Sequence, residues 1–243
     1  MKEIAAKNTH KRVFELLLAH EQIRTVLDIP CGEGAFLLRL RNAGFDAIGA
    51  DIARSGSIEE ERFKSADMNS ALPFEDESFD AVVCIDGIEH IENVFAFFRE
   101  CRRILRPGGI LFLSTPNISA VRSRWRHFLT GFHNKGKSPL NENRVTPFHH
   151  INLLSYPMAR YALHTNGFRI SRVTTNRTKL ISWIYLLAWP LSYITSRLAF
   201  RRDDKEGAKR ALNAEVIRQM HSLSLYLGET MIIEAHKKEI QDT

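Results

Sequence analysis

Short apolar runs alternate with helix-like segments along the first half of the chain. The runs have the length of strands, and the segments between them place apolar residues three and four positions apart, as on one face of a helix. The strands predicted in this way span residues 25–29, 45–50, 63–67, 79–85 and 110–114, and the helices span 35–43 and 94–105. This alternation predicts an α/β fold in which a parallel sheet carries helices on both faces.

The remaining segments depart from this alternation. A helix with Val13, Phe14, Leu17 and Leu18 on one face is expected within residues 1–22. The second half predicts a basic helix or loop over 118–131, helices over 156–166 and 203–226, an apolar segment over 179–202, and strands over 168–175 and 228–236. Because no linker separates two units, we predict one domain, 1–243, with a basic lid insertion at 117–150 and an apolar, helical insertion at 177–226 before the last strand.

Composition narrows the class of protein without naming a function. Of 243 residues, 44% are hydrophobic and 26% are charged, which is ordinary for a globular protein, and 13 Gly, 8 Pro and 3 Cys exclude collagen-like, disordered and disulfide-rich chains. The odd cysteine number without a CxxC pair indicates reduced thiols, and residues 1–20 lack the apolar run of a signal peptide. We therefore expect a cytoplasmic protein. The net charge of +6 permits an anionic partner but does not demand one.

A glycine-containing loop follows the first predicted strand. It reads Asp-Ile-Pro-Cys-Gly-Glu-Gly over residues 28–34, and glycines at a strand–helix junction let a ligand approach exposed backbone amides. The dinucleotide-binding motif would require glycine where Leu37 stands, and Glu33 would repel a pyrophosphate. A phosphate-binding P-loop is excluded because no Gly-Lys-Ser/Thr follows. The loop suits a ligand with an ammonium group and no phosphate.

Acidic residues follow the predicted strands in order. Asp51 ends the second strand, where a carboxylate can accept both ribose hydroxyls. Asp67 ends the third, where it could accept from an adenine amino group while Met68 packs on the ring. Together with Asp28 these positions indicate an adenosine without phosphates. The alternative is that the glycines only make a turn and the aspartates cap helices.

Four ordered segments resemble the class I S-adenosylmethionine-dependent methyltransferases, in particular the group of the ubiquinone-pathway enzymes. They are VLDIPCGEG, IGAD, SADMNSALPFEDESFDAVVCIDGIEHIEN and RECRRILRPGGILFLSTPN. The resemblance is close over about residues 24–117 and weaker over 149–168. It implies a Rossmann-like, doubly wound, seven-stranded and mostly parallel sheet with the last strand antiparallel, and S-adenosyl-L-methionine as cofactor. It implies cofactor contacts from Asp28, Pro30, Cys31, Gly32, Gly34, Asp51, Ile52, Asp67, Met68, Ile85 and Asp86.

Two features depart from the family pattern. Pro30 replaces the usual first glycine, which stiffens the loop without removing a needed side chain. The stretch between Asp51 and Asp67 is short, so we expect a reduced helix there.

The segment after the fourth strand is the candidate reaction site. In a helical turn Asp86, Glu89 and His90 would share one face beside the sulfonium. With His149 or His150 they could hold a divalent ion, an arrangement similar to the metal-dependent small-RNA 2′-O-methyltransferases, and the Glu-His pair also resembles the ubiquinone-pathway O-methyltransferases. The catalytic candidates are therefore Glu89, His90, His149 and His150, and the metal candidates are Asp86, Glu89, His90 and His150. The alternatives are a histidine acting as a metal-free base, and a capping role for Glu89 and His90 with Asp86 on the cofactor.

The basic insertion carries six cations and interleaved aromatic residues. Its cations are Arg122, Arg124, Arg126, Lys135, Lys137 and Arg144, against Glu142 alone. Such a lid could attract a phosphate, a uronate, an anionic lipid headgroup or RNA, although no recognised RNA-binding module supports nucleic acid. A solvated basic face is the alternative.

The apolar insertion contains no charged residue from 180 to 196, between Lys179 and Arg197. Pro190 interrupts this run, and the strands on either side should pair in one sheet, which argues against a single membrane span. Aromatic residues and basic flanks fit peripheral membrane contact through residues 179–202. A helix that covers the acceptor pocket, or a dimer contact, is the alternative.

These features together predict an S-adenosylmethionine-dependent methyltransferase. We expect it to O-methylate a small or lipid-linked acceptor at the cytoplasmic membrane face, such as an envelope glycan intermediate, a polyprenyl ring or a lipid. The acid–histidine site, and the absence of an Asn-Pro-Pro-Tyr amide clamp, favour a hydroxyl. An RNA 2′-O-methyltransferase and a non-catalytic cofactor-binding regulator are the alternatives, and the oligomeric state is left open.

Overall fold

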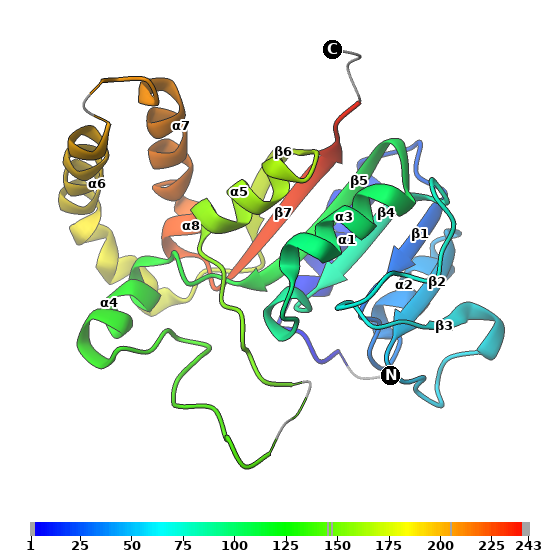
Figure 1. Cartoon of the computed structure of the whole chain (residues 1–243). Coiled ribbons are helices and arrows are strands. Elements are labelled where there is room, and N and C mark those ends of the chain that lie inside the picture. Colours follow the sequence, from blue (N-terminus) through cyan, green and yellow to red (C-terminus); the bar gives the residue numbers. More distant parts are fainter. Residues whose placement is uncertain (1–2, 145, 147, 205, 240–243) are drawn as a thin grey trace.

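The computed structural model describes residues 3–144, 146, 148–204 and 206–239. Seven strands form one sheet in the order β3-β2-β1-β4-β5-β7-β6 (Figure 1). Neighbouring strands are parallel except at β7, which runs antiparallel to both β5 and β6. The predicted fold class is confirmed. The strands are β1 (Thr25–Asp28), β2 (Asp46–Asp51), β3 (Phe63–Ser65), β4 (Phe79–Ile85), β5 (Leu105–Pro116), β6 (Phe168–Thr175) and β7 (Thr230–Lys237).

The strand order reverses beside β1. The chain moves outward from β1 through β2 to β3, and then returns to place β4 on the other side of β1. In open parallel sheets the connections leave the strands to opposite faces at such a point, and a crevice opens beyond their carboxyl ends. The loops after β1, β2 and β4 all lie at this edge, which positions the candidate site.

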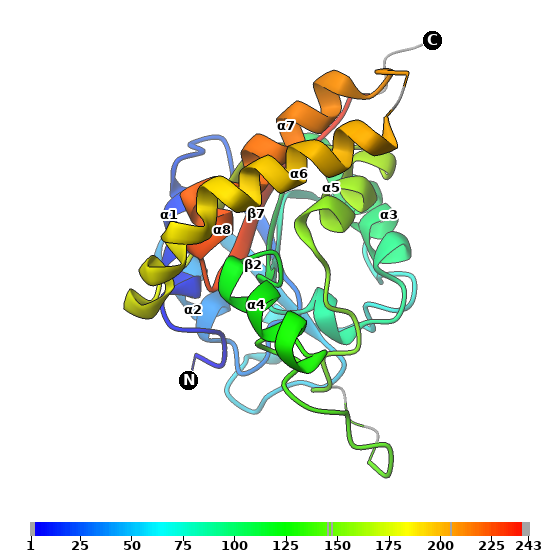
Figure 2. The ribbon, with the colours of Figure 1, turned by 90° about the vertical axis from the view of Figure 1, so that its left-hand side faces the viewer.

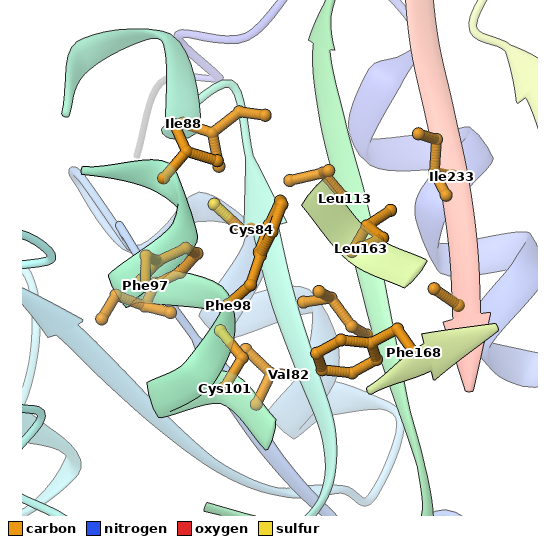
Figure 3. Close-up of a cluster of buried hydrophobic side chains, with 14 of the residues drawn as sticks. Val82, Cys84, Ile88, Phe97, Phe98, Cys101, Leu113, Leu163, Phe168 and Ile233 are labelled. Atoms are coloured by element: carbon orange, nitrogen blue, oxygen red, sulfur yellow. The ribbon is translucent and has the colours of Figure 1, made fainter. Parts of the chain in front are cut away.

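Two helix layers cover the sheet, because alternate residues of each strand point to opposite faces. Val26 and Val83 face the helices α1 (Thr9–Leu18) and α2 (Ala35–Asn42) in one hydrophobic cluster. Leu27 and Val82 face α3 (Val94–Ile104) and α5 (Tyr156–Thr165) in the other. Figure 3 shows part of the second cluster, in which labelled side chains of α3, α5 and the strands meet: Val82, Cys84, Phe97, Phe98, Leu113, Leu163, Phe168 and Ile233.

Several boundaries differ from the sequence predictions. The N-terminal helix covers only Thr9–Leu18, and its buried face holds Leu16 in place of Leu18, which is 51% exposed. Residues 13, 16 and 17 follow the helical repeat, whereas 14 and 18 lie beside it. The stretch after Asp51 contains only a 3₁₀ turn, η1 (Glu60–Arg62), so the expected reduction of that helix is confirmed.

The remaining helices lie beside the sheet around β7 (Figure 2). They are α4 (Val121–Thr130), η3 (Leu180–Ala188), α6 (Trp189–Asp203), α7 (Arg210–Met220) and α8 (Leu223–Leu227), with a 3₁₀ turn, η2 (Ile88–His90), after β4. The predicted helix over 203–226 is broken in two, because Ser222 caps α8 by accepting a hydrogen bond from the Leu225 amide. None of the helices in the described ranges combines the length and the apolar composition needed to traverse a bilayer.

A few residues of the predicted segments lie outside the described residues. They belong to the N-terminal helix, the basic insertion, the apolar insertion and the C-terminus, and are residues 1–2, 145, 147, 205 and 240–243.

An aspartate joins three strands at the edge opposite the candidate site. The Asp80 carboxylate in β4 accepts hydrogen bonds from the Arg24 and Thr25 amides and the Thr25 hydroxyl, at 2.8–3.0 Å. The Arg106 guanidinium in β5 donates to its other oxygen at 2.7 Å. Burial opposes ionisation, but these hydrogen bonds outweigh it and lower the pKa of Asp80 to about 2.

We expect Asp80→Asn to destabilise the fold by about 1 kcal/mol at pH 7, because the site is partly solvated and its ionised acceptor is lost. A pKa that is lower in the folded state gives stability above the unfolded value of about 4, and this stability is lost as the pH falls toward 2. Thermal unfolding at pH 7 should show a melting temperature lower by roughly 2–4 °C, and the difference should shrink at pH 3. Asp46→Asn, at an exposed ion pair with Arg62, is the matched control. An equal effect of both changes would contradict this role.

Candidate active site

The loop after β1 depends on two glycines in left-handed conformations. Gly32 has φ 52° and Gly34 has φ 82°, and Gly34 begins α2 as its N-cap. Side chains with a Cβ rarely adopt such values. The Cys31 amide donates to the Ala50 carbonyl at 2.9 Å, which holds the loop against β2. The loop therefore presents backbone at the carboxyl edge of the sheet, as the sequence predicts.

Asp28 is a buried acid at the base of this loop. It is 1% exposed, and its Oδ2 has no hydrogen-bond partner among the described residues. Burial raises the pKa of Asp28 well above its usual range. A buried carboxyl oxygen without a partner is costly, and a positively charged ligand or an ammonium donor would satisfy it.

Asp51 lies across the loop from Asp28, at the end of β2. Its Oδ2 accepts from the Gly32 amide at 2.9 Å and its Oδ1 accepts from the Ile52 amide at 2.8 Å. Each carboxylate oxygen can accept more than one hydrogen bond, so acceptor positions are left for two hydroxyls. The Ile52 side chain is 54% exposed beside it and offers an apolar surface at the same edge. These residues fit a ribose and an adjoining flat ring.

The two residues expected to contact adenine, Asp67 and Met68, lie in different environments. Asp67 is exposed, and its Oδ1 accepts from the Asn69 amide at 2.9 Å. Met68 is only 7% exposed and belongs to the hydrophobic cluster with α3. The structure therefore leaves Asp67 open to a ligand, while most of the Met68 side chain packs into the core.

Cys31 and Pro30 contribute packing to the loop. Cys31 is 7% exposed, and burial together with the nearby Asp28 and Asp51 raises the pKa of its thiol, which stays protonated. A Cβ on Gly49 would lie 3.0 Å from the Cys31 sulfur, and one on Gly87 would overlap the Pro30 ring. These two glycines, which sequence reasoning missed, let the loop pack closely against β2 and against the turn after β4.

Ile85 ends β4 on the other side of β1, and Asp86 follows it. Asp86 has φ 48°, a left-handed value that is uncommon for a residue with a side chain. The Ser114 hydroxyl donates to its Oδ1 at 2.7 Å, and the Ala6 amide approaches its Oδ2 at 3.4 Å. The turn that follows is a 3₁₀ helix, η2, and not the expected α-helical turn. Asp86 is thereby held toward Ser114 and the N-terminal segment.

Glu89 is buried under the same edge. It is 0% exposed, and its Oε2 accepts from the Thr115 hydroxyl at 3.0 Å, while its Oε1 has no hydrogen-bond partner among the described residues. Burial and the charge of Asp86 raise the pKa of Glu89 to about 8. At neutral pH the group is therefore mostly a neutral acid. Thr115 is a partner that no local sequence signal indicates.

Three histidines meet across two distant segments. His90 Nδ1 lies 3.0 Å from the His149 carbonyl oxygen, and the His90 and His150 ring centroids are 4.8 Å apart. Because a carbonyl can only accept, His90 Nδ1 carries the hydrogen and Nε2 of the neutral ring keeps a lone pair. Burial lowers the pKa of both rings, and each of them is neutral at pH 7. His149 contributes its backbone oxygen to this contact.

The same groups supply the donor atoms that a metal ion could use. Donor atoms of Glu89, His90 and His150 lie within 4.8 Å of one another. This His₂-carboxylate set could hold a divalent transition metal. Asp86, a predicted ligand, is not a member of this group, and its carboxylate accepts a hydrogen bond from Ser114. The geometry is therefore open to a three-residue ion site or to metal-free acid–base chemistry.

Comparison with known proteins agrees with this geometry. The model of the methyltransferase domain family matches residues 1–173. A probable S-adenosylmethionine-dependent methyltransferase from Mycolicibacterium smegmatis is 29% identical over 166 residues, which are 66% of this chain and 58% of that protein. A ubiquinone biosynthesis O-methyltransferase from Mesorhizobium japonicum is 30% identical over 102 residues, which are 38% of this chain and 41% of that protein. The chain thus matches about half the length of these curated relatives.

Solved structures support the fold. A SAM-dependent methyltransferase from Archaeoglobus fulgidus superposes with a TM-score of 0.56 at 18% identity, over 94% of this chain and 92% of that one. A protein from Pyrococcus horikoshii gives a TM-score of 0.58 at 18% identity, over 98% of this chain and 94% of that one. At this level of identity the likeness concerns the fold alone.

The chain belongs to the methyltransferase domain family. It carries an S-adenosylmethionine-dependent methyltransferase domain of class I, and the cofactor of this family is S-adenosylmethionine. The predicted family, enzyme class and cofactor are confirmed. The unpartnered Asp28 oxygen, the glycine backbone and the open acceptor positions of Asp51 fit this ligand.

We expect Asp51→Ala to weaken S-adenosylmethionine binding at least tenfold, because two ionised hydrogen bonds to ribose hydroxyls are each worth roughly 1.5–3 kcal/mol. Isothermal titration calorimetry with the purified protein measures the affinity. Asp46→Ala removes the same charge from the opposite end of β2 and should leave binding unchanged. Equal affinity of Asp51→Ala and wild type would show that the ribose is held elsewhere.

Proposed function

We propose that this domain transfers a methyl group to a hydroxyl of a small or lipid-linked acceptor, with His90 as the general base. The observation that carries the proposal is the His90 ring, whose Nδ1–H is committed to the His149 carbonyl while Nε2 is free to accept a proton. Burial keeps this ring neutral, as a base must be before it acts. Similarity to ubiquinone biosynthesis O-methyltransferases supports a hydroxyl acceptor.

The cofactor, when bound, supplies a methyl group on a sulfonium, which is an activated leaving group. The chain must then position the hydroxyl in line and take its proton, because a neutral hydroxyl is a weak nucleophile. His90 Nε2 receives that proton as the oxygen–methyl bond forms. The His149 carbonyl stabilises the resulting imidazolium through the Nδ1 hydrogen.

Glu89 and His150 position the base in this proposal. Glu89 lies within 4.8 Å of both imidazoles, and Thr115 fixes the orientation of its carboxyl group. The Asn152 amide donates to the Glu89 carbonyl at 3.0 Å, which joins the segment 149–152 to the turn after β4. The two halves of the site, which α3, β5 and α4 separate in the chain, are thereby held together.

A lipid-linked acceptor is supported by an exposed apolar surface on η3 and α6. Leu180 and Leu187 are 88% and 87% exposed, and Leu191 is 67% exposed. Trp125 and Phe128 of α4 are also exposed, at 51% and 77%, and α4 contacts η3. Cations precede and follow this apolar run in the chain at Lys179, Arg197, Arg201 and Arg202. An apolar helix face with basic flanks fits the surface of an anionic membrane, and we propose that the protein acts at its cytoplasmic face.

We expect His90→Gln to lower methyl transfer roughly 10²–10⁴-fold, because proton removal loses its base. A first assay screens lipid, glycan and RNA extracts for transfer of a tritiated methyl group. The rates of wild type and variant are then compared on the extract that becomes labelled. His164→Gln, at the far end of α5, should retain activity.

Two further arms test this assignment. Activity should persist in a chelator, since His90 takes the proton without an ion. If a chelator abolishes activity and a divalent ion restores it, Glu89, His90 and His150 are instead metal ligands. If only the RNA extract becomes labelled, RNA is the acceptor and the proposed small or lipid-linked acceptor is wrong.

We expect the double change Leu180→Ser and Leu187→Ser to weaken binding to phosphatidylglycerol-containing vesicles at least roughly tenfold, because each buried leucine contributes about 1.5–3 kcal/mol. Flotation in a density gradient measures the bound fraction. Leu18→Ser with Leu38→Ser removes two exposed leucines of α1 and α2 and is the control. Equal flotation of both variants would reject the membrane surface.

A further inference from the structure

A small cavity opens beside the reaction site, between α4, the segment after it, η3 and the start of β7. Its volume is about 130 Å³. Four cationic side chains line it, and they come from three separate segments of the chain: Arg122 from α4, Lys135 and Lys137 from the segment after α4, and Lys179 from the start of η3. The sequence placed three of these cations in the basic insertion but could not show that they surround one cavity.

The charges of this cavity are unbalanced. Among the described residues no carboxylate forms a salt bridge with Arg122, Lys135 or Lys137. Glu229 is the acidic residue that lines the cavity, and it is already paired with Lys179 at 2.8 Å and with Arg177 at 2.6 Å. Three cations are thus left without a counter-charge around one small volume, and like charges held this close repel one another.

The cavity has fixed polar walls. Asn117 is 4% exposed, and its amide donates to the Leu225 and Gly228 carbonyls at 2.8 and 3.1 Å, which holds the end of α8 against the end of β5. Ser123 is 1% exposed, and its hydroxyl accepts from the Asn134 amide at 3.2 Å. The segment that carries Lys135 is therefore anchored to α4. A site with such walls is preorganised, which lowers the cost of binding.

The cavity adjoins the candidate base. Asn117 and Thr115 are separated by a single residue at the end of β5, and the Thr115 hydroxyl donates to Glu89. The positive charge of Lys135 acts on both Glu89 and His150, so this side chain is electrostatically coupled to the cavity and to the reaction site. A group bound in the cavity would thus lie near the residues that surround the candidate base.

We propose that this cavity binds a phosphate-class dianion carried by the methyl acceptor. A single carboxylate would neutralise one of the three unpaired cations, whereas a phosphate monoester or a diphosphate neutralises about two and offers three or more acceptor oxygens. Arg122 provides the planar fork that binds two phosphate oxygens together, and the lysines provide point charges. The inference rests on the proposed function, and it narrows the acceptor to phosphorylated molecules, either soluble or lipid-anchored.

The test compares two double variants that remove equal charge. Arg122→Ala with Lys137→Ala removes two cavity cations, and Lys64→Ala with Arg169→Ala removes an exposed lysine of β3 and an exposed arginine of β6 that do not line the cavity. Calorimetry with inorganic pyrophosphate should give at least tenfold weaker binding for the cavity variant and wild-type binding for the control. S-adenosylmethionine affinity, measured on each protein, reports that the domain is folded. Loss of S-adenosylmethionine binding by wild type would contradict the methyltransferase assignment, whereas a failure of pyrophosphate binding alone concerns only the anion site.

A second arm identifies the source of the phosphate. Flotation compares vesicles of phosphatidylcholine with vesicles that also contain phosphatidic acid, whose headgroup is a phosphate monoester. Selective loss of pyrophosphate binding by the cavity variant supports the site and a soluble or diphosphate acceptor, and selective loss of phosphatidic acid binding supports the site and a lipid headgroup. Identical behaviour of the cavity variant and the control in both arms, or no binding by wild type in either, overturns the proposal.

Discussion

The candidate site depends on the close packing of loop side chains against two glycines at the reversal of strand order. The loop after β1 lies against β2 and against the turn after β4, and there is no space for a Cβ at Gly49 or Gly87. This packing places the buried Asp28 between two loops and lets Gly32 donate to Asp51. A wider spacing would admit water to Asp28 and separate the groups that fit the cofactor.

The electrostatic character of the carboxyl edge changes from one side of the sheet to the other. Beside β1 and β2 the edge is acidic, with Asp28 and Asp51, which suits a ligand with a positive sulfonium and an ammonium group. Beside β5 and β7 it is basic, with Arg122 and Lys137 around a cavity. Glu89 lies between these two regions in a buried position, where its raised pKa favours the neutral form. A positively charged donor and an anionic acceptor would thus each meet complementary charge, and the two would meet beside the neutral histidines.

The segments 117–150 and 177–226 supply residues on which the proposed acceptor site depends. The segment from α4 to residue 152 supplies Lys135 and the His149 carbonyl, and η3 supplies Lys179 and exposed leucines. Helices α4, η3 and α6 lie beside β5, β6 and β7, and residues 149–152 reach the turn after β4 (Figures 1 and 2). The loop after β1 and the proposed acceptor site thus occupy different parts of the carboxyl edge. This division follows from the fold, since one sheet edge can hold one ligand while variable loops form the other pocket.

The sequence by itself determined the class of fold, and it predicted the edge of the sheet at which the cofactor binds. Strand periodicity, two glycines and ordered acidic strand ends are local signals, and parallel strands bring their carboxyl ends to one edge. Only the tertiary structure decided that Thr115 meets Glu89, that His90 bonds to the His149 carbonyl, that Met68 packs inward, and that Arg122 and Lys179 share a cavity. Each of these depends on contacts between residues distant in the chain or on the path of an irregular loop, and neither leaves a periodic pattern for sequence reasoning to detect.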